Sequence, residues 1–216
     1  MKKVFISAGH GGSDPGATAN GFKEKDLNLD IAFACFYELE RHCVDVKLSR
    51  QGDENDPVEE EVKECNAYKP DLAISIHNNA GGGDGAEAWY HHGGGTGKVL
   101  AENVLAEIVK IGQNSRGAKT RKGSDGRDYY CFIRETSAPA VIVECAFVDN
   151  ANDMQIIDTA AEREKMGIAI AKGILSTLNI AWVEEKKPEP AQTSKEYVIN
   201  LEKLKAEGYS KIILEV

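Results

Sequence analysis

The 216-residue sequence lacks several features that mark other classes of protein. No stretch approaches the roughly 20 consecutive apolar residues of a transmembrane helix, so we expect no membrane span. Positive charge is in deficit, because 26 Lys and Arg face 35 Asp and Glu, and the net charge of −9 argues against nucleic acid or an anionic membrane as partner. No Cys-x-x-Cys pair occurs, and the cysteine count is odd, which excludes a zinc ribbon and a disulfide framework. All five cysteines are therefore expected to be small buried hydrophobic residues.

Strand-like and helix-like segments alternate along the chain. Apolar runs predict strands at 3–7, 44–48, 71–76, 86–90, 129–134 and 140–145. Apolar residues at helical spacing, or helix-start signals, predict helices near 24–41, 57–68, 98–111 and 163–178. This alternation predicts a three-layer α/β sandwich with a mainly parallel sheet.

The composition changes near Glu184, where a charged, proline-bearing run begins. We therefore expect a main domain at 1–182, a linker at 183–194 and a short accessory segment at 195–216. The last segment is too short to bury a core of its own. Its apolar residues could pack on the main domain, pair with another chain in self-association, or begin a further module.

Two histidines follow predicted strands. His10 stands in a glycine-rich turn after strand 3–7, and His77 follows strand 71–76. The carboxyl ends of parallel strands meet at one edge of a sheet, so the two imidazoles can converge on one ion. Catalytic zinc often takes two His and one Glu, and Glu24 begins the helix after the His10 loop. Taken singly, each residue has an ordinary explanation as a loop histidine or a helix-terminal charge; together they predict a zinc site.

Glu144 is a lone charged residue near the end of an apolar strand. Charged residues are seldom buried without a partner or a role. A general base beside a metal-activated water explains it, and the structural alternative is a buried ion pair with a residue such as Arg134.

These residues lie in blocks that resemble the type-3 family of zinc-dependent N-acetylmuramoyl-L-alanine amidases. The resemblance runs from about Lys3 to Leu178 and rests on the order and spacing of several blocks. These are Ile6-Ser7-Ala8-Gly9-His10-Gly11-Gly12, Asp14-Pro15-Gly16-Ala17, Glu24–Leu29, Ser75–Ala80, Gly85–Tyr90, Arg116–Lys119 and Pro139–Asn150.

The resemblance implies that His10, Glu24 and His77 bind Zn²⁺ and that Glu144 is the catalytic carboxylate. It also implies a twisted sheet of about six strands flanked by helices, and hydrolysis of the amide between N-acetylmuramic acid and L-alanine in peptidoglycan. The chain departs from the family where the helix before His77 usually carries an Arg and here has Glu61.

Other interpretations compete with this one. A zinc carboxypeptidase or other peptidoglycan peptidase could use a similar scaffold, and a catalytically dead wall-binding module would be expected to have lost Glu144 or a ligand. His91 and His92 could form a second metal site, but adjacent strand residues point to opposite faces, which favours surface positions. The apolar stretch after Met1 is short for a secretory signal, so we expect synthesis in the cytoplasm and action on the cell wall after release or lysis.

Overall fold

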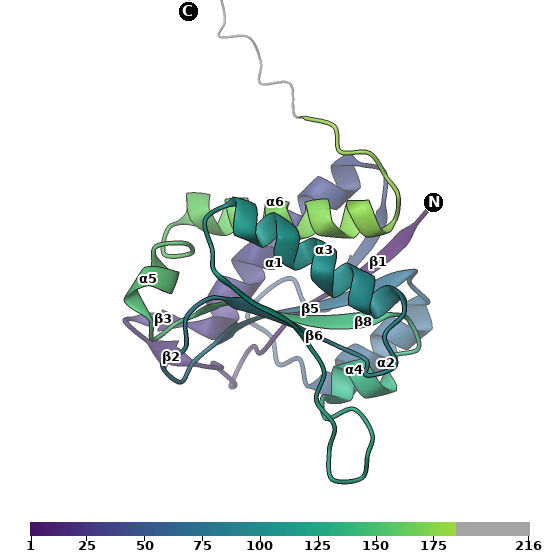
Figure 1. Ribbon diagram of the computed structural model, residues 1–216, viewed down its shortest axis with the longest axis horizontal. Coiled ribbons are helices and arrows are strands. Elements are labelled where there is room, and N and C mark those ends of the chain that lie inside the picture. The colour runs from purple at the N-terminus through teal and green to yellow at the C-terminus, as the bar shows by residue number, and fades with distance from the viewer. Residues whose placement is uncertain (185–216) are drawn as a thin grey trace, which may run out of the picture. The chain divides into compact units, whose positions relative to one another are not determined.

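A computed structural model describes residues 1–184 and shows a sheet between two layers of helices (Figure 1). The six-stranded sheet has the order β4-β1-β5-β8-β6-β7. Its strands are β1 (Lys3–Ala8), β4 (Asp45–Leu48), β5 (Leu72–Asn79), β6 (Ala86–Tyr90), β7 (Ser115–Lys119) and β8 (Ala140–Phe147). All neighbours pair in parallel except β6 and β8, which are antiparallel. The predicted three-layer, mainly parallel α/β fold is confirmed.

The helices divide between the two faces of the sheet. They are α1 (Glu24–Arg41), α2 (Val58–Tyr68), α3 (Thr96–Lys110), α4 (Cys131–Glu135), α5 (Ala151–Met154) and α6 (Ala160–Thr177). Helices α1, α3 and α6 cover one face and α2 and α4 the other, while a small hairpin of β2 (Thr18–Ala19) and β3 (Phe22–Lys23) leads into α1 (Figure 1). Within the described part of the chain, no helix combines the length and apolar character needed to cross a membrane.

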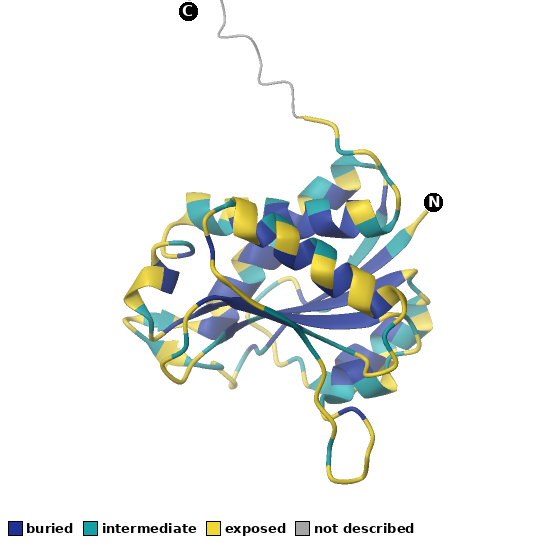
Figure 2. Ribbon diagram, in the orientation of Figure 1, coloured by how far each residue is buried: buried dark blue, intermediate teal, exposed yellow. Residues whose placement is uncertain are grey.

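Alternation along the central strands gives the two faces different chemistry. In β5, Ile74 and Ile76 join the core under α1, α3 and α6, whereas Ala73 joins the smaller core under α2 and α4. Side chains on a strand alternate, so Ser75 and His77 lie on the α2/α4 face. Figure 2 shows how completely these central strands are buried. The α2/α4 face therefore carries polar groups toward the carboxyl ends of the strands, on a rigid base.

Two expectations need correction. The predicted strand at 129–134 is wrong, because that segment is a turn followed by the short helix α4. The sixth strand is instead β7, a half-exposed edge strand without an apolar run. Burial of all five cysteines is also wrong, since Cys43 is exposed and Cys131 only partly buried.

Residues 1–182 form one compact unit. The expected linker at 183–194 and the accessory segment at 195–216 lie outside the described residues, apart from Val183 and Glu184. Both remain expectations from sequence.

Candidate metal centre

Three elements carry the predicted ligands to one end of the sheet. His10 follows β1 with φ of 65°, Glu24 is the first residue of α1, and His77 lies inside β5. Because β1 and β5 pair in parallel up to Ala8 and Ile76, the His10 loop and His77 lie beside each other. Strand β5 thus runs further than the sequence indicated, and His77 belongs to the strand itself.

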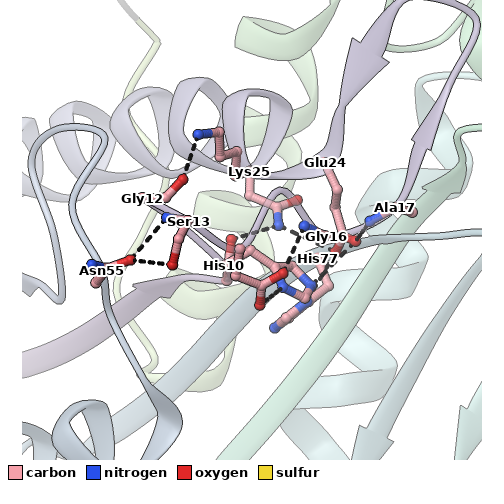
Figure 3. A network of polar contacts seen from close by, with 12 residues as sticks. His10, Gly12, Ser13, Gly16, Ala17, Glu24, Lys25, Asn55 and His77 are labelled. Atoms are coloured by element: carbon pink, nitrogen blue, oxygen red, sulfur yellow. Dashed lines mark hydrogen bonds and ion pairs between the residues drawn. The ribbon is translucent and has the colours of Figure 1, made fainter.

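The three side chains converge, as Figure 3 shows. His10 Nε2 lies 3.2 Å from Glu24 Oε2, and His77 Nδ1 lies 3.0 Å from Glu24 Oε1. The two imidazole rings meet edge to face with centroids 5.0 Å apart. One ligand atom from each residue falls within 4.8 Å of the other two, so the structure brings the predicted ligands together.

The Glu24 carboxylate is fixed in this position by surrounding donors. The backbone N–H groups of Ala17 and Asn78 donate to its two oxygens at 2.8 and 3.0 Å. The Asn28 amide donates to the same carboxylate at 3.3 Å and to the Gly9 carbonyl at 2.9 Å. A Cβ at Gly9 would collide with the His77 ring, so only glycine allows this close approach. Such outer contacts orient a ligand before any ion arrives.

Electrostatics inside the cluster favour positive charge. Burial alone would raise the pKa of Glu24, but the hydrogen bonds with His10 and His77 lower it far below its usual value. Burial would lower the pKa of His10, but Glu24 and Asp14 raise it to about 9. The pKa of His77 is also raised, because its contact with Glu24 outweighs burial. An ionised carboxylate between two imidazoles is an environment that a divalent cation fits.

Glu144 lies one strand away from the cluster, in β8. It is paired in register with His77 on β5 and with Glu87 on β6. Burial raises the pKa of Glu144 to about 7, and no hydrogen bond or ion pair holds its side chain within the described residues. Arg134 binds Glu135 instead, so the structural alternative of a Glu144–Arg134 pair is not what the structure shows.

A cavity of about 330 Å³ opens on the α2/α4 face beside the cluster. Its lining residues are His10, Asp14, Asp56, Pro57, Val58, Glu61, Ser75, His77, Tyr130, Cys131, Phe132 and Ile142. Glu144 is not among them and lies next to His77 instead. In the sequence, Glu61 stood out only as a departure from the family pattern, and nothing pointed to Tyr130. The positions of both residues in the cavity depend on how α2 and α4 pack.

A second group also gathers possible metal ligands. His91, His92 and Asp128 bring one ligand atom each within 4.8 Å of the others. The expectation that adjacent histidines point to opposite faces is wrong here, because β6 ends at Tyr90 and strand alternation ends with it. Both histidines are exposed, as expected for surface positions.

Comparisons with known proteins point to one family. Residues 4–176 match the family described as N-acetylmuramoyl-L-alanine amidase. The N-acetylmuramoyl-L-alanine amidase CwlM of Bacillus licheniformis is 36% identical over 185 residues, which cover 84% of this chain and 70% of that protein.

Two solved structures have the same fold. The catalytic domain of CwlV, an N-acetylmuramoyl-L-alanine amidase from Bacillus (Paenibacillus) polymyxa, superposes with a TM-score of 0.75 at 29% identity, covering 84% of this chain and all of that domain. Cwp6 from Clostridium difficile reaches a TM-score of 0.81 at 39% identity over 82% of this chain, which is 29% of that larger protein.

Proposed function

The chain belongs to the N-acetylmuramoyl-L-alanine amidase family and is a peptidoglycan hydrolase, and from this premise we propose that it works with one Zn²⁺ held by His10, Glu24 and His77 and with Glu144 as the general base. The bond is the amide between N-acetylmuramic acid and L-alanine of the stem peptide. The convergence of three ligand atoms within 4.8 Å, one strand from a half-buried carboxyl that has no hydrogen-bond or ion-pair partner among the described residues, carries the proposal.

The donor set supports zinc as the metal. Two imidazoles and one carboxylate are a common ligand set of catalytic zinc, and they leave a position open for water or substrate. When bound, zinc supplies Lewis-acid activation of a water and of the scissile carbonyl. The surrounding residues keep the ligands in place, since Glu24 accepts from two backbone N–H groups and His10 Nδ1 lies 2.8 Å from Asp14 Oδ2.

Glu144 moves the protons in the proposed reaction. Its pKa of about 7 lies near a neutral working pH, which suits a group that first accepts a proton and then returns it. It takes the proton from the attacking water as the water oxygen bonds to the carbonyl carbon, and it delivers that proton to the nitrogen of L-alanine as the C–N bond breaks, which leaves the lactyl group as a carboxylate. Glu144 and His77 are register partners in the adjacent strands β8 and β5, so the sheet fixes the proposed base beside the proposed ligand.

The cavity beside the cluster gives the substrate its place. Its lining combines apolar groups, among them Val58, Phe132 and Ile142, with the polar side chains of the cluster and of Asp56 and Glu61. Such a site surrounds the reacting amide with apolar groups and strengthens the local electrostatics. We further propose that the enzyme meets its substrate in the cell wall.

Metal analysis combined with end-group labelling tests the proposal. Purified protein should carry zinc, Glu24→Gln should lose it, and chelation should abolish activity that zinc restores. Digested peptidoglycan should gain amino groups on L-alanine and no reducing sugar ends. A glycosidase would produce reducing ends, and a peptidase would free amino groups further along the stem. Full activity in metal-free protein would overturn the zinc assignment, whereas a labelled residue other than alanine would overturn the bond.

A further inference from the structure

The turn after β6 and the segment leading into α4 meet through three side chains. His91 and His92 follow directly after β6. Asp128 lies near the end of the loop between β7 and α4, which hangs below the sheet in Figure 1. His91 Nε2 lies 3.0 Å and His92 Nδ1 2.8 Å from the same oxygen, Asp128 Oδ2. The two rings stack with centroids 4.6 Å apart, and one nitrogen of each ring faces the carboxylate.

We propose that His91, His92 and Asp128 form a second Zn²⁺ site that links two loops and is separate from the proposed catalytic cluster. The donor set of two imidazoles and one carboxylate repeats that of His10, Glu24 and His77. In a tetrahedral site with bonds of about 2.0–2.1 Å, ligand atoms lie about 3.3 Å apart. The two distances to Asp128 Oδ2 are within about 0.5 Å of that spacing. His91 Nδ1 accepts the backbone N–H of Gly93 at 3.0 Å, so zinc binding at Nε2 requires the ring to release that contact and carry its proton on Nδ1.

The surroundings of Asp128 fit a metal ligand. The side chain is buried, and its other oxygen, Oδ1, accepts the backbone N–H of His92 at 2.9 Å, which orients the carboxylate. Burial would raise the pKa of Asp128, but the hydrogen bonds from His92 lower it, so the carboxylate is ionised at neutral pH. The nearby Arg134 guanidinium is occupied by Glu135, which offsets its positive charge.

Solvent can reach an ion bound in this cluster from the side of the two histidines. The His91 side chain is about half exposed and borders an open cavity that Arg134 and Thr136 also line. Water can therefore complete the coordination of an ion here, as in other zinc sites with three protein ligands.

The ion would join two segments far apart in sequence. The loop between β7 and α4 is mostly exposed, and two residues after Asp128 it supplies Tyr130 to the wall of the catalytic cavity. Zinc at Asp128 would fix the end of this loop to the turn after β6 and so hold the wall in position. This inference does not depend on the proposed mechanism at Glu144.

Zinc stoichiometry on tag-free, full-length protein tests the site. Wild type should bind two Zn²⁺ per chain. Asp128→Asn, which keeps shape but removes the anionic ligand, should bind one, with affinity at the lost site reduced about 100-fold or more. The control Asp125→Asn makes the same change in the same loop, outside the cluster, and should keep two. Glu24→Gln should lose the other ion, so failure of either site is seen separately.

Amide hydrogen exchange gives a second measurement that does not depend on stoichiometry. Zinc should slow exchange in residues 120–130 of wild type and of Asp125→Asn, but not in Asp128→Asn or in the double variant His91→Ala/His92→Ala. A single zinc in wild type, or a second zinc that persists in both disabled variants, overturns the proposal. Either result would leave the three side chains as a hydrogen-bonded clamp.

Discussion

Two glutamates face the α2/α4 side of the sheet near the metal centre. Glu61 comes from α2 and Glu144 from β8, and burial raises the pKa of each to about 7. Glu61 lies near Ser7 and no cation is paired with it in the described residues. A carboxyl whose pKa lies near neutrality would assist proton transfer at Glu144 in the proposed mechanism, whereas the same raised pKa at Glu61 would destabilise the folded chain.

At Glu144, the amide replacement should separate catalysis from metal binding. Glu144→Gln keeps the shape of the side chain but cannot accept a proton, so turnover should fall by roughly 10²-fold or more while zinc remains bound. Metal analysis and release of stem peptides measure the two properties independently. Loss of zinc would make Glu144 a ligand, and near-normal turnover would make it structural.

At Glu61, the amide should stabilise the protein in a pH-dependent way. A raised carboxyl pKa contributes stability that is fully present below the unfolded pKa of about 4.5 and is lost as pH rises through about 7. Glu61→Gln should therefore raise the free energy of unfolding at pH 8, on the order of 1–3 kcal/mol, with little effect at pH 4.5. Urea unfolding of chelator-treated protein at both pH values measures this.

The control for that experiment is Glu59→Gln, an exposed carboxyl in the first turn of the same helix. Its stability should follow the wild-type pH profile. If Glu61→Gln gives no gain at pH 8 over Glu59→Gln, the buried charge at Glu61 is compensated and the interpretation fails.

Individual site residues differ in how far the sequence could predict them. His10, Glu24 and His77 were predictable because each stands near the end or the start of an element that the sequence pattern indicates, and the structure brings all three together. Their roles as ligands remain predictions. The His91–His92–Asp128 group was foreseeable only in part. The sequence offered the two histidines as a possible metal pair, but their convergence with Asp128 depends on β6 ending at Tyr90 and on where a long loop returns.

Between elements, the crossing of α1 and α6 depends on one small residue. At Gly167 in α6, an added Cβ would lie 2.6 Å from the Ile31 carbonyl oxygen and 2.8 Å from the Cys35 backbone nitrogen, both in α1. Gly167→Ala should lower the free energy of unfolding by about 1–3 kcal/mol, although alanine favours an isolated helix by about 1 kcal/mol. Ser176→Ala, exposed on the same helix, should have no such effect in thermal or urea unfolding.

Helices and strands were predicted best where a clear pattern of apolar residues marked both ends. The bounds of α1 and β6 agree with the expected ranges, because an 18-residue helix and a bounded apolar strand leave little ambiguity. The strand prediction for 129–134 was wrong because a short apolar run has the same pattern in a strand and in a buried helix. Phe132 and Ile133 are buried, but they belong to the short helix α4. Strand β7 was missed because it is a half-exposed edge without an apolar run.

For the whole molecule, residues 1–182 should be sufficient for folding and activity. Trp182 packs at the end of this unit, stacked on His42 with ring centroids 4.7 Å apart. A chain ending at Glu184 should keep its thermal transition and its hydrolysis of peptidoglycan, as circular dichroism and stem-peptide release would show. Unfolding of the shortened chain would show that the accessory segment at 195–216 is part of the domain. A second truncation, before Trp182, should be less stable because it loses that stacking.

The pairing of β1, β5 and β8 also bears on folding kinetics. Val4 pairs with Leu72, and Ile74 with Val141, so adjacent central strands come from residues roughly 70 positions apart. Such high contact order makes the sheet slow to assemble, because long loops must close before these contacts form. Since His77 and Glu144 are register partners in β5 and β8, the proposed catalytic centre is incomplete in a chain emerging from the ribosome until its last strand is in place. The newly made hydrolase is thus inert for most of its synthesis by topology alone.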